Sequence, residues 1–216
     1  MSNPKIILFD VDGVLICLPN YFTKELENKG YAGAEEVMNP FYRGEINWAY
    51  TEGRSDAREM VGPYLEKFGW KGTAQEYFDE QFQFERRFLD QDLIALVVNL
   101  KNQDVLCCLA TDQEKYRAKF LMDEMDFKNI FDKYYFSCEI GKRKCADEFW
   151  KYVLWDAEKD LPGIQPWEIV YFDDIQKNIE IASSFGIQSF LFTDKLQFEN
   201  DMNMLGFDVS LNKFLS

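Results

Sequence analysis

Short runs of apolar residues recur along the chain, and each run gives way to polar residues. The runs cover residues 5–9, 105–110, 134–136, 169–172 and 189–192, and apolar and polar positions do not alternate within them. Runs of this length are typical of strands that are buried on both faces of a parallel sheet. We therefore predict a parallel sheet built from these segments.

Helical periodicity follows two of the runs. Apolar residues recur at helical spacing at Ala118, Leu121, Met122 and Met125, and again at Ile175, Ile179 and Ala182. Gly186 then stands where a helix C-terminal cap is expected. Strands that alternate with helices predict the α/β class, with a doubly wound, Rossmann-like parallel sheet. Ligands of such folds bind at the carboxyl ends of the strands, so the polar residues that end the runs are candidate functional residues.

The first run ends at residue 9 and the second begins only at residue 105, which is too long a gap for one crossover helix. Apolar stripes with charged faces predict helices over 21–28, 55–68 and 73–88. We expect residues 18–90 to form a small α-helical cap over the strand ends, and residues 1–17 and 91–216 to form the core. Four aromatic residues of the insertion are assigned to the interior of the cap: Phe41, Tyr42, Trp48 and Tyr50.

Composition narrows the chemistry. The 38 acidic and 24 basic residues give a net charge of −14, which disfavours binding to nucleic acid. The chain has no histidine, which excludes Ser-His and Cys-His nucleophile pairs and histidine-ligated metals. The five cysteines include no CxxC pair, so we expect a reduced, cytoplasmic protein. The polar start of the chain leads us to expect no signal peptide, and no apolar stretch approaches the length of a membrane span.

Two strand ends deliver paired carboxylates. Asp10 and Asp12 follow the first run and enter a turn at Gly13, where one acid can act as a nucleophile and the other as an acid or base. An ordinary acidic turn would have the same sequence. Asp173 and Asp174 follow the fourth run, and two adjacent acids suit a hard cation such as Mg²⁺. The alternative for this pair is capping of the next helix.

Two further segments could bind an anion. Thr111 ends the second run and can hold a phosphate with its hydroxyl, although Thr111 and Glu114 also have capping-box spacing. Lys142, Arg143 and Lys144 form the densest positive cluster in an acidic chain. A cluster of this kind on its own is more often a solvated loop.

These four segments, in this order, resemble the motifs of the haloacid dehalogenase (HAD) superfamily, specifically its phosphatase-type members with a helical cap after the first motif. The motifs are matched by residues 9–15, by Thr111, by Ser137, Gly141 and Lys144, and by Asp173, Asp174 and Asn178. The spacing of the third motif selects Lys144 over its two basic neighbours. The resemblance covers essentially the whole chain.

The resemblance implies an enzyme, a Mg²⁺-dependent hydrolase that acts on a small phosphate monoester such as a sugar phosphate. Asp10 would be the nucleophile that forms an aspartyl-phosphate, and Asp12 the general acid and base. Thr111 and Lys144 would bind the phosphoryl oxygens. Asn178 would orient Lys144.

The resemblance also implies the metal site. Mg²⁺ would be held by Asp10, by the backbone carbonyl of Asp12 and by Asp174, with Asp173 in the outer shell. Phosphomutases of the same family would share these residues, and a binding protein that kept the fold but lost turnover is the alternative of another class. A dehalogenase is disfavoured because family dehalogenases lack the acid at the position of Asp12.

Two features depart from the family pattern. Asp112 replaces the neutral residue that usually follows in the second motif, and a carboxylate beside a phosphate is unfavourable unless it points away or pairs with a cation. The third motif reads Lys144-Cys145-Ala146-Asp147 without the usual prolines. In the cap, Arg43 and Arg54 are candidates for substrate contacts, with plain surface roles as the alternative.

Overall fold

The computed structural model describes residues 4–209 and contains a five-stranded sheet in which all strands are parallel. The strand order is β3-β2-β1-β4-β5. The strands are β1 (Ile6–Phe9), β2 (Leu106–Thr111), β3 (Lys133–Phe136), β4 (Ile169–Asp173) and β5 (Gln188–Leu191). Each lies within one residue of an apolar run, so the predicted parallel sheet is confirmed.

Burial differs between the centre and the edges of the sheet. Every residue of β1 and β4 is buried, as continuous apolar runs predict. The expectation of burial on both faces is wrong for β3 and β5, where Tyr134 and Leu191 are exposed. These two strands form the sheet edges, and each has a neighbouring strand on one side only.

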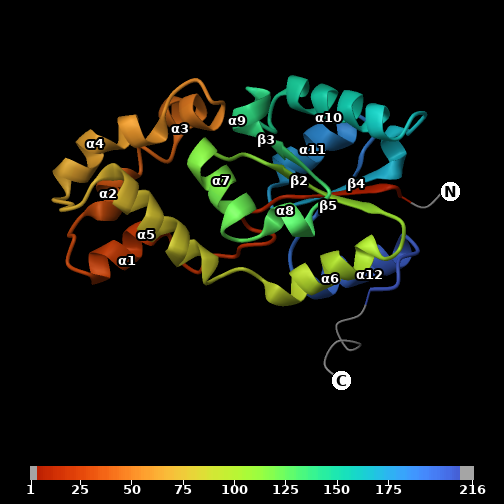
Figure 1. Cartoon of the computed structure of the whole chain (residues 1–216), viewed down its shortest axis with the longest axis horizontal. Coiled ribbons are helices and arrows are strands. Elements are labelled where there is room, and N and C mark those ends of the chain that lie inside the picture. The colour runs from red at the N-terminus through yellow and green to blue at the C-terminus, as the bar shows by residue number, and fades with distance from the viewer. Residues whose placement is uncertain (1–3, 210–216) are drawn as a thin grey trace.

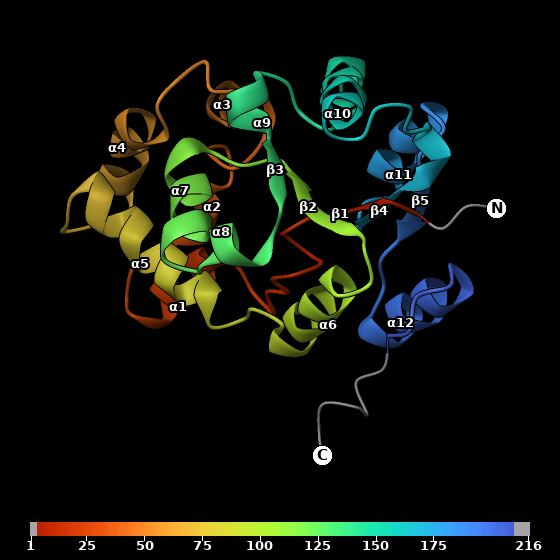
Figure 2. The same ribbon diagram turned by 45° about the vertical axis from the view of Figure 1, so that its right-hand side comes forward.

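Helices cover both faces of the sheet, as Figures 1 and 2 show. One face packs against α10 (Asp147–Asp160) and α11 (Gln176–Ser184). The other face packs against α6 (Gln91–Lys101), α7 (Lys115–Asp123), α8 (Phe127–Ile130) and α12 (Lys195–Met204). The short α9 (Ser137–Ile140) follows β3 directly, and a 3-10 turn, Pro166–Glu168, precedes β4. The predicted doubly wound α/β core is therefore confirmed.

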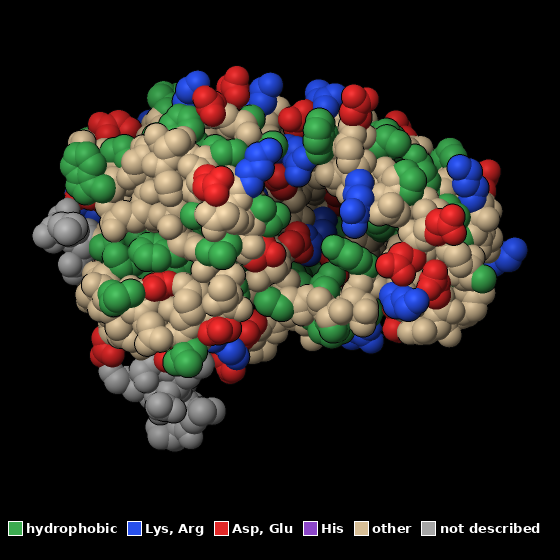
Figure 3. Space-filling model, turned by 180° about the vertical axis from the view of Figure 1, so that it is seen from behind, with side chains coloured by type: hydrophobic (Ala, Val, Ile, Leu, Met, Phe, Trp, Pro, Cys, Tyr) green, Lys and Arg blue, Asp and Glu red, His purple; other side chains and the backbone are tan. Residues whose placement is uncertain are grey.

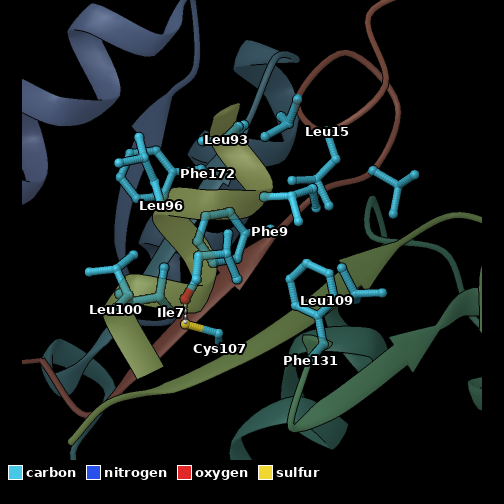
Figure 4. Packing of buried hydrophobic residues seen from close by; sticks show 14 of the residues in the cluster. Ile7, Phe9, Leu15, Leu93, Leu96, Leu100, Cys107, Leu109, Phe131 and Phe172 are labelled. Atoms are coloured by element: carbon cyan, nitrogen blue, oxygen red, sulfur yellow. Dashed lines mark hydrogen bonds between the residues drawn. The ribbon is translucent and has the colours of Figure 1, made fainter. Parts of the chain in front are cut away.

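Aliphatic and aromatic side chains together fill the layer between this face of the sheet and its helices (Figure 4). Phe9 of β1 is fully buried and stacks on Phe172 of β4, with ring centroids 6.1 Å apart. The ring of Phe198 on α12 contacts both of them, at 5.8 Å and 4.8 Å. This packing fixes the relative position of β1 and β4, whose carboxyl ends carry the candidate acids.

The segment between β1 and β2 is helical up to α6. It contains α1 (Phe22–Asn28), α2 (Ala34–Met38), α3 (Gly44–Thr51), α4 (Ala57–Lys67) and α5 (Ala74–Arg86). Three of these helices match the predicted ones, whereas α2 and α3 were not anticipated. The five helices share a hydrophobic cluster of their own, to which Phe41 and Tyr50 contribute.

The two connections between this helical segment and the core run side by side. Ile16 pairs with Leu89 in an antiparallel bridge, and the amide of Asp90 donates to the carbonyl of Leu15 at 2.9 Å. We propose that residues 18–90 form a separate cap domain and that this paired segment is its hinge.

Within residues 4–209, no helix combines the length and the apolar character that a membrane span requires.

The two valines at positions 97 and 98 of α6 test which helix face packs on the sheet. Val97 is fully buried and Val98 is 47% exposed. Val97→Ala should lower the free energy of unfolding by about 2 kcal/mol, because it leaves a cavity in the core. Val98→Ala, the matched control, should change it by less than about 0.5 kcal/mol in urea denaturation. Equal effects of the two substitutions would contradict this orientation of α6.

Candidate active site

The first and the fourth motif follow the neighbouring strands β1 and β4, and the parallel sheet brings them together at the carboxyl ends of these strands. Phe9 lies opposite Phe172 in the register of β1 and β4, so the next residues, Asp10 and Asp173, are level with each other. The chain runs from β1 to one side of the sheet and returns to its other side through β4, which makes this pair a topological switch point. Such a point is where open α/β sheets bind their ligands.

A buried lysine bridges these two acids. The Nζ atom of Lys144 lies 2.6 Å from Oδ2 of Asp10 and 2.6 Å from Oδ2 of Asp173. Lys144 is 2% exposed, Asp10 is 4% exposed and Asp173 is fully buried. The third-motif spacing thus selected the lysine that reaches the acids, since Lys142 is exposed.

One ammonium group cannot fully compensate two buried carboxylates. Burial and, to a smaller extent, the charges of Asp173 and Asp12 raise the pKa of Asp10 to about 8, although Lys144 acts against them. Burial also acts on Asp173, but the charge and hydrogen bond of Lys144 outweigh it and lower the pKa of Asp173. Asp173 is therefore the fixed counter-ion, and Asp10 is the acid that lacks charge compensation.

The carboxylate of Asp173 is fully engaged by its neighbours. It accepts hydrogen bonds from the Tyr171 hydroxyl, from the amide of Ile175 at 2.7 Å and from Nδ2 of Asn178 at 3.0 Å. The hydrogen bonds of Asn178 thus go to Asp173, and any effect on Lys144 passes through that acid. Asp173 is not the N-cap residue of α11, which is Ile175, but its side chain accepts from the amide of that residue, so it also fixes the start of the helix.

Asp174 completes a cluster of carboxylates that fits a divalent cation. Asp10, Asp173 and Asp174 each offer an oxygen, and these oxygens lie within 4.8 Å of one another. The Asp174 carboxylate lies against Gly13, where an added β-carbon would overlap it, and Gly13 has φ of +80°. Burial and the charge of Asp173 raise the pKa of Asp174. Oxygen donors with excess negative charge are what Mg²⁺ requires.

Thr111 lies at the end of β2 with its side chain buried. Its hydroxyl accepts a hydrogen bond from Nε2 of Gln113 at 3.0 Å. The capping-box prediction for Thr111 is wrong, because α7 begins only at Lys115. Its N-cap is Glu114, whose side chain accepts from the amides of Tyr116 and Arg117. An extended stretch separates β2 from α7, so Thr111 is the last residue of the strand and does not cap the helix.

Asp12 is held by a residue that the sequence reasoning missed. Nη1 and Nη2 of Arg117 donate to the two carboxylate oxygens of Asp12, both at 2.7 Å, and Nε2 of Gln113 donates to Oδ2 at 2.9 Å. Burial raises the pKa of Asp12, but the charge and hydrogen bonds of Arg117 outweigh it and lower that pKa. The sequence feature that could have identified Arg117 is its position on the helix after the second motif, four residues after Gln113.

Asp112 points away from the acids, toward the loop that carries Lys144. Its Oδ1 accepts from the amide of Lys144 at 2.9 Å, and its Oδ2 accepts from Nε of Arg143 at 3.0 Å. On the other side, Nε1 of the buried Trp150 donates to the carbonyl of Lys144 at 2.8 Å. These contacts hold a loop that lacks the usual prolines.

The cap arginines proposed for substrate contacts are both exposed. Arg54 forms an ion pair with Glu52 at 2.8 Å, and Arg43 is the N-cap residue of α3. Trp48 is the exception among the four aromatic residues assigned to the cap interior, since it is 47% exposed and its ring lies 5.7 Å from the guanidinium of Arg143. Trp48 is thus the cap residue that reaches the Lys144 loop.

Amide exchange tests the role of Asp112 in that loop. Asp112→Ala should speed hydrogen exchange of the Lys144 amide about tenfold, because the substitution removes its acceptor. Asp112→Asn keeps an acceptor oxygen and should have a smaller effect. Unchanged protection in the alanine variant, measured by mass spectrometry on the segment 141–146, would contradict this assignment.

The chain has distant relatives among known proteins, although it matches no protein-family model. It is 24% identical over 215 residues to bifunctional epoxide hydrolase 2 of Sus scrofa, which covers 88% of this chain and 36% of that protein. It is 25% identical over 206 residues to a probable pseudouridine-5′-phosphatase of Saccharomyces cerevisiae, over 86% of this chain and 82% of that one. The chain therefore spans about a third of the length of the epoxide hydrolase.

Solved structures share the whole fold. A HAD family enzyme from Bacteroides thetaiotaomicron has a TM-score of 0.73 at 20% identity, over 93% of this chain and 99% of that chain. The wild-type form of that enzyme, in complex with magnesium and inorganic phosphate, has a TM-score of 0.70 at 21% identity, over 90% and 98% of the two chains. The predicted resemblance is thus confirmed at the level of the fold, and the chain has the fold of the HAD family.

Proposed function

We propose that the protein is a Mg²⁺-dependent hydrolase of small phosphate monoesters, and that the reaction passes through a phosphoryl group on Asp10. The observation that carries this proposal is the bridge from Lys144 to Asp10 and Asp173 at 2.6 Å each, beside the carboxylate of Asp174. This arrangement supports the proposal, because the candidate nucleophile, the candidate phosphate-binding cation and the candidate metal ligands lie together at the carboxyl ends of the strands.

The reaction would take two steps that balance in atoms and charge. An oxygen of Asp10 attacks phosphorus, and the ester oxygen leaves with the proton that Asp12 supplies. Water then attacks the phosphorus of the aspartyl-phosphate and gives a proton to Asp12, which releases inorganic phosphate and the Asp10 carboxylate. Lys144 and Thr111 would bind the phosphoryl oxygens and stabilise the charge on the transferring group.

The carboxylates of Asp10 and Asp174, with the backbone carbonyl of Asp12, would hold Mg²⁺. When bound, the ion would supply positive charge to the phosphoryl group and to Asp10, whose pKa is raised to about 8 without it. Asp173 would stay in the outer shell, since its oxygens are taken by Lys144 and Asn178. The magnesium and phosphate complex of the structural relative supports this choice of ion.

The substrate is proposed to be small. Figure 3 shows a hollow between the cap and the core in which acidic and basic side chains lie together. The net charge of −14 disfavours a polyanionic partner such as nucleic acid. A pseudouridine-5′-phosphatase among the relatives supports a phosphorylated sugar or a similar metabolite.

The alternatives are weaker on structural grounds. A silent binding protein was favoured only by Asp112, and that carboxylate holds the Lys144 loop instead of facing the acids. A phosphomutase would keep the same residues and transfer the phosphoryl group to a sugar. No contact among residues 4–209 favours a mutase over a hydrolase.

Hydrolysis of an aryl phosphate tests the proposal. The wild-type protein should hydrolyse the aryl phosphate in the presence of Mg²⁺ and should lose this activity when a chelator is added. Asp10→Asn should lower turnover by a factor of about 10³ or more, because the amide is a poor nucleophile. The circular dichroism spectrum of Asp10→Asn should match that of the wild-type protein, which would show that the fold is intact. Asp194→Asn, at an exposed helix N-cap of α12, is a matched control that should keep full activity.

Three outcomes would contradict the proposal. Activity that survives in Asp10→Asn would contradict the assignment of Asp10 as the nucleophile. Activity that is equal with and without chelator would contradict the dependence on Mg²⁺. Release of a phosphorylated sugar rather than inorganic phosphate, from a sugar phosphate substrate, would assign the protein as a mutase.

A further inference from the structure

A single arginine joins the core acid Asp12 to an acid of the cap. Arg117 on α7 is 7% exposed. Its Nη1 and Nη2 donate to the two oxygens of Asp12 at 2.7 Å, and its Nε donates to Oε2 of Glu85 at 2.6 Å. Glu85 lies on α5 of the cap and is buried as well. One guanidinium group therefore bridges two carboxylates that belong to different parts of the molecule.

The bridge continues into the interior of the cap. Gln81 donates from Nε2 to Oε1 of Glu85 at 2.8 Å, and the Tyr42 hydroxyl donates to Oε1 of Gln81 at 2.8 Å. The Tyr42 hydroxyl also lies 2.7 Å from that of Tyr77, which is fully buried in the cap cluster. The position of Glu85, and through it that of Arg117, is thus set by the packing of the cap.

The bridge also reaches the phosphate-binding side of the site. Nη1 of Arg117 donates to Oε1 of Gln113 at 2.6 Å. The amide nitrogen of that glutamine donates both to Asp12 and to the hydroxyl of Thr111. The fork of Arg117 and the amide of Gln113 together leave the Asp12 carboxylate one orientation, because a bidentate pair fixes the plane of both groups.

We propose that Arg117 is a positioning residue that ties Asp12 to Glu85 of the cap, so that proton delivery to the leaving group depends on where the cap sits. The inference rests on the proposed function for the role of Asp12, and it goes beyond that function in linking catalysis to the cap. A second contact between the cap and α7 provides a control: Lys115 pairs with Asp56 at 2.6 Å, whereas the side-chain partners of Asp12 are Arg117 and Gln113.

Two esters that differ in their leaving group separate positioning from a structural role. An aryl oxide leaves without a proton, whereas an alkoxide needs one, so only the alkyl ester depends strongly on Asp12. Arg117→Met should lower kcat/KM for an alkyl phosphate at least about tenfold more than for an aryl phosphate. Arg117→Lys should recover part of this difference, because it restores one donor and the charge.

Two further variants control for the loss of a cation from α7 and for the destabilisation that Arg117→Met is expected to cause. Lys115→Met removes a cation from the same helix and should affect both esters equally. Arg117→Met leaves Glu85 buried without its partner, so the double variant Arg117→Met, Glu85→Gln removes that unpaired charge and should show the same leaving-group dependence. Equal losses for both esters in these Arg117 variants would overturn the proposal.

Hydrogen exchange tests the bridge without any turnover. Glu85→Gln weakens the cap end of the bridge, and we expect amide exchange in residues 11–15 of the core to become several-fold faster. Lys115→Met should leave it unchanged. If the wild-type protein hydrolyses neither ester, the proposed function fails while this measurement still decides on the bridge. Unchanged exchange in Glu85→Gln would overturn the bridge itself.

Discussion

The ion bridge of Lys144 with Asp10 and Asp173 is the interaction on which the site depends. Charges that are removed from water are costly unless their partners are close and well oriented. Lys144 meets this condition with two carboxylates at 2.6 Å, and Asp173 is further satisfied by Tyr171 and Asn178. The aromatic packing of β1 against β4 holds the two acids level. Loss of the lysine would leave two buried carboxylates without a cation.

The two acids of the first motif are treated differently by the fold. Asp10 is buried and receives too little positive charge, so it favours a bound cation. Asp12 is half exposed, and both of its oxygens accept from the guanidinium of Arg117, which Glu85 shares. Their surroundings shift the two pKa values in opposite directions, that of Asp10 upward and that of Asp12 downward. For the proposed roles, a bound cation must ionise Asp10, and Asp12 must take up a proton before the leaving group departs.

The sheet and the four motifs could be predicted from the sequence because both depend on local patterns. Strands buried between helix layers appear as apolar runs, and the acids that follow them mark the ligand edge. The edge strands β3 and β5 were found by the same pattern, but their exposure depends on the strand order. Short α2 and α3 lack a long periodic stripe and were missed for that reason.

The contacts between cap and core could not be predicted in this way. Arg117 and Glu85 lie 32 positions apart on two helices, and only the fold brings them to 2.6 Å. The same holds for Asp112, which looked unfavourable beside a phosphate until its partners, the amide of Lys144 and the side chain of Arg143, were located. Pairwise side-chain contacts of this kind have no signature in local spacing.

The stereochemical course at phosphorus tests the central claim most directly. A substrate with an isotopically chiral phosphoryl group would be hydrolysed in the presence of Mg²⁺, and the configuration of the phosphate product determined. Two in-line displacements, first by Asp10 and then by water, predict net retention. Net inversion would show a single direct attack by water and would contradict a phosphoryl intermediate on Asp10.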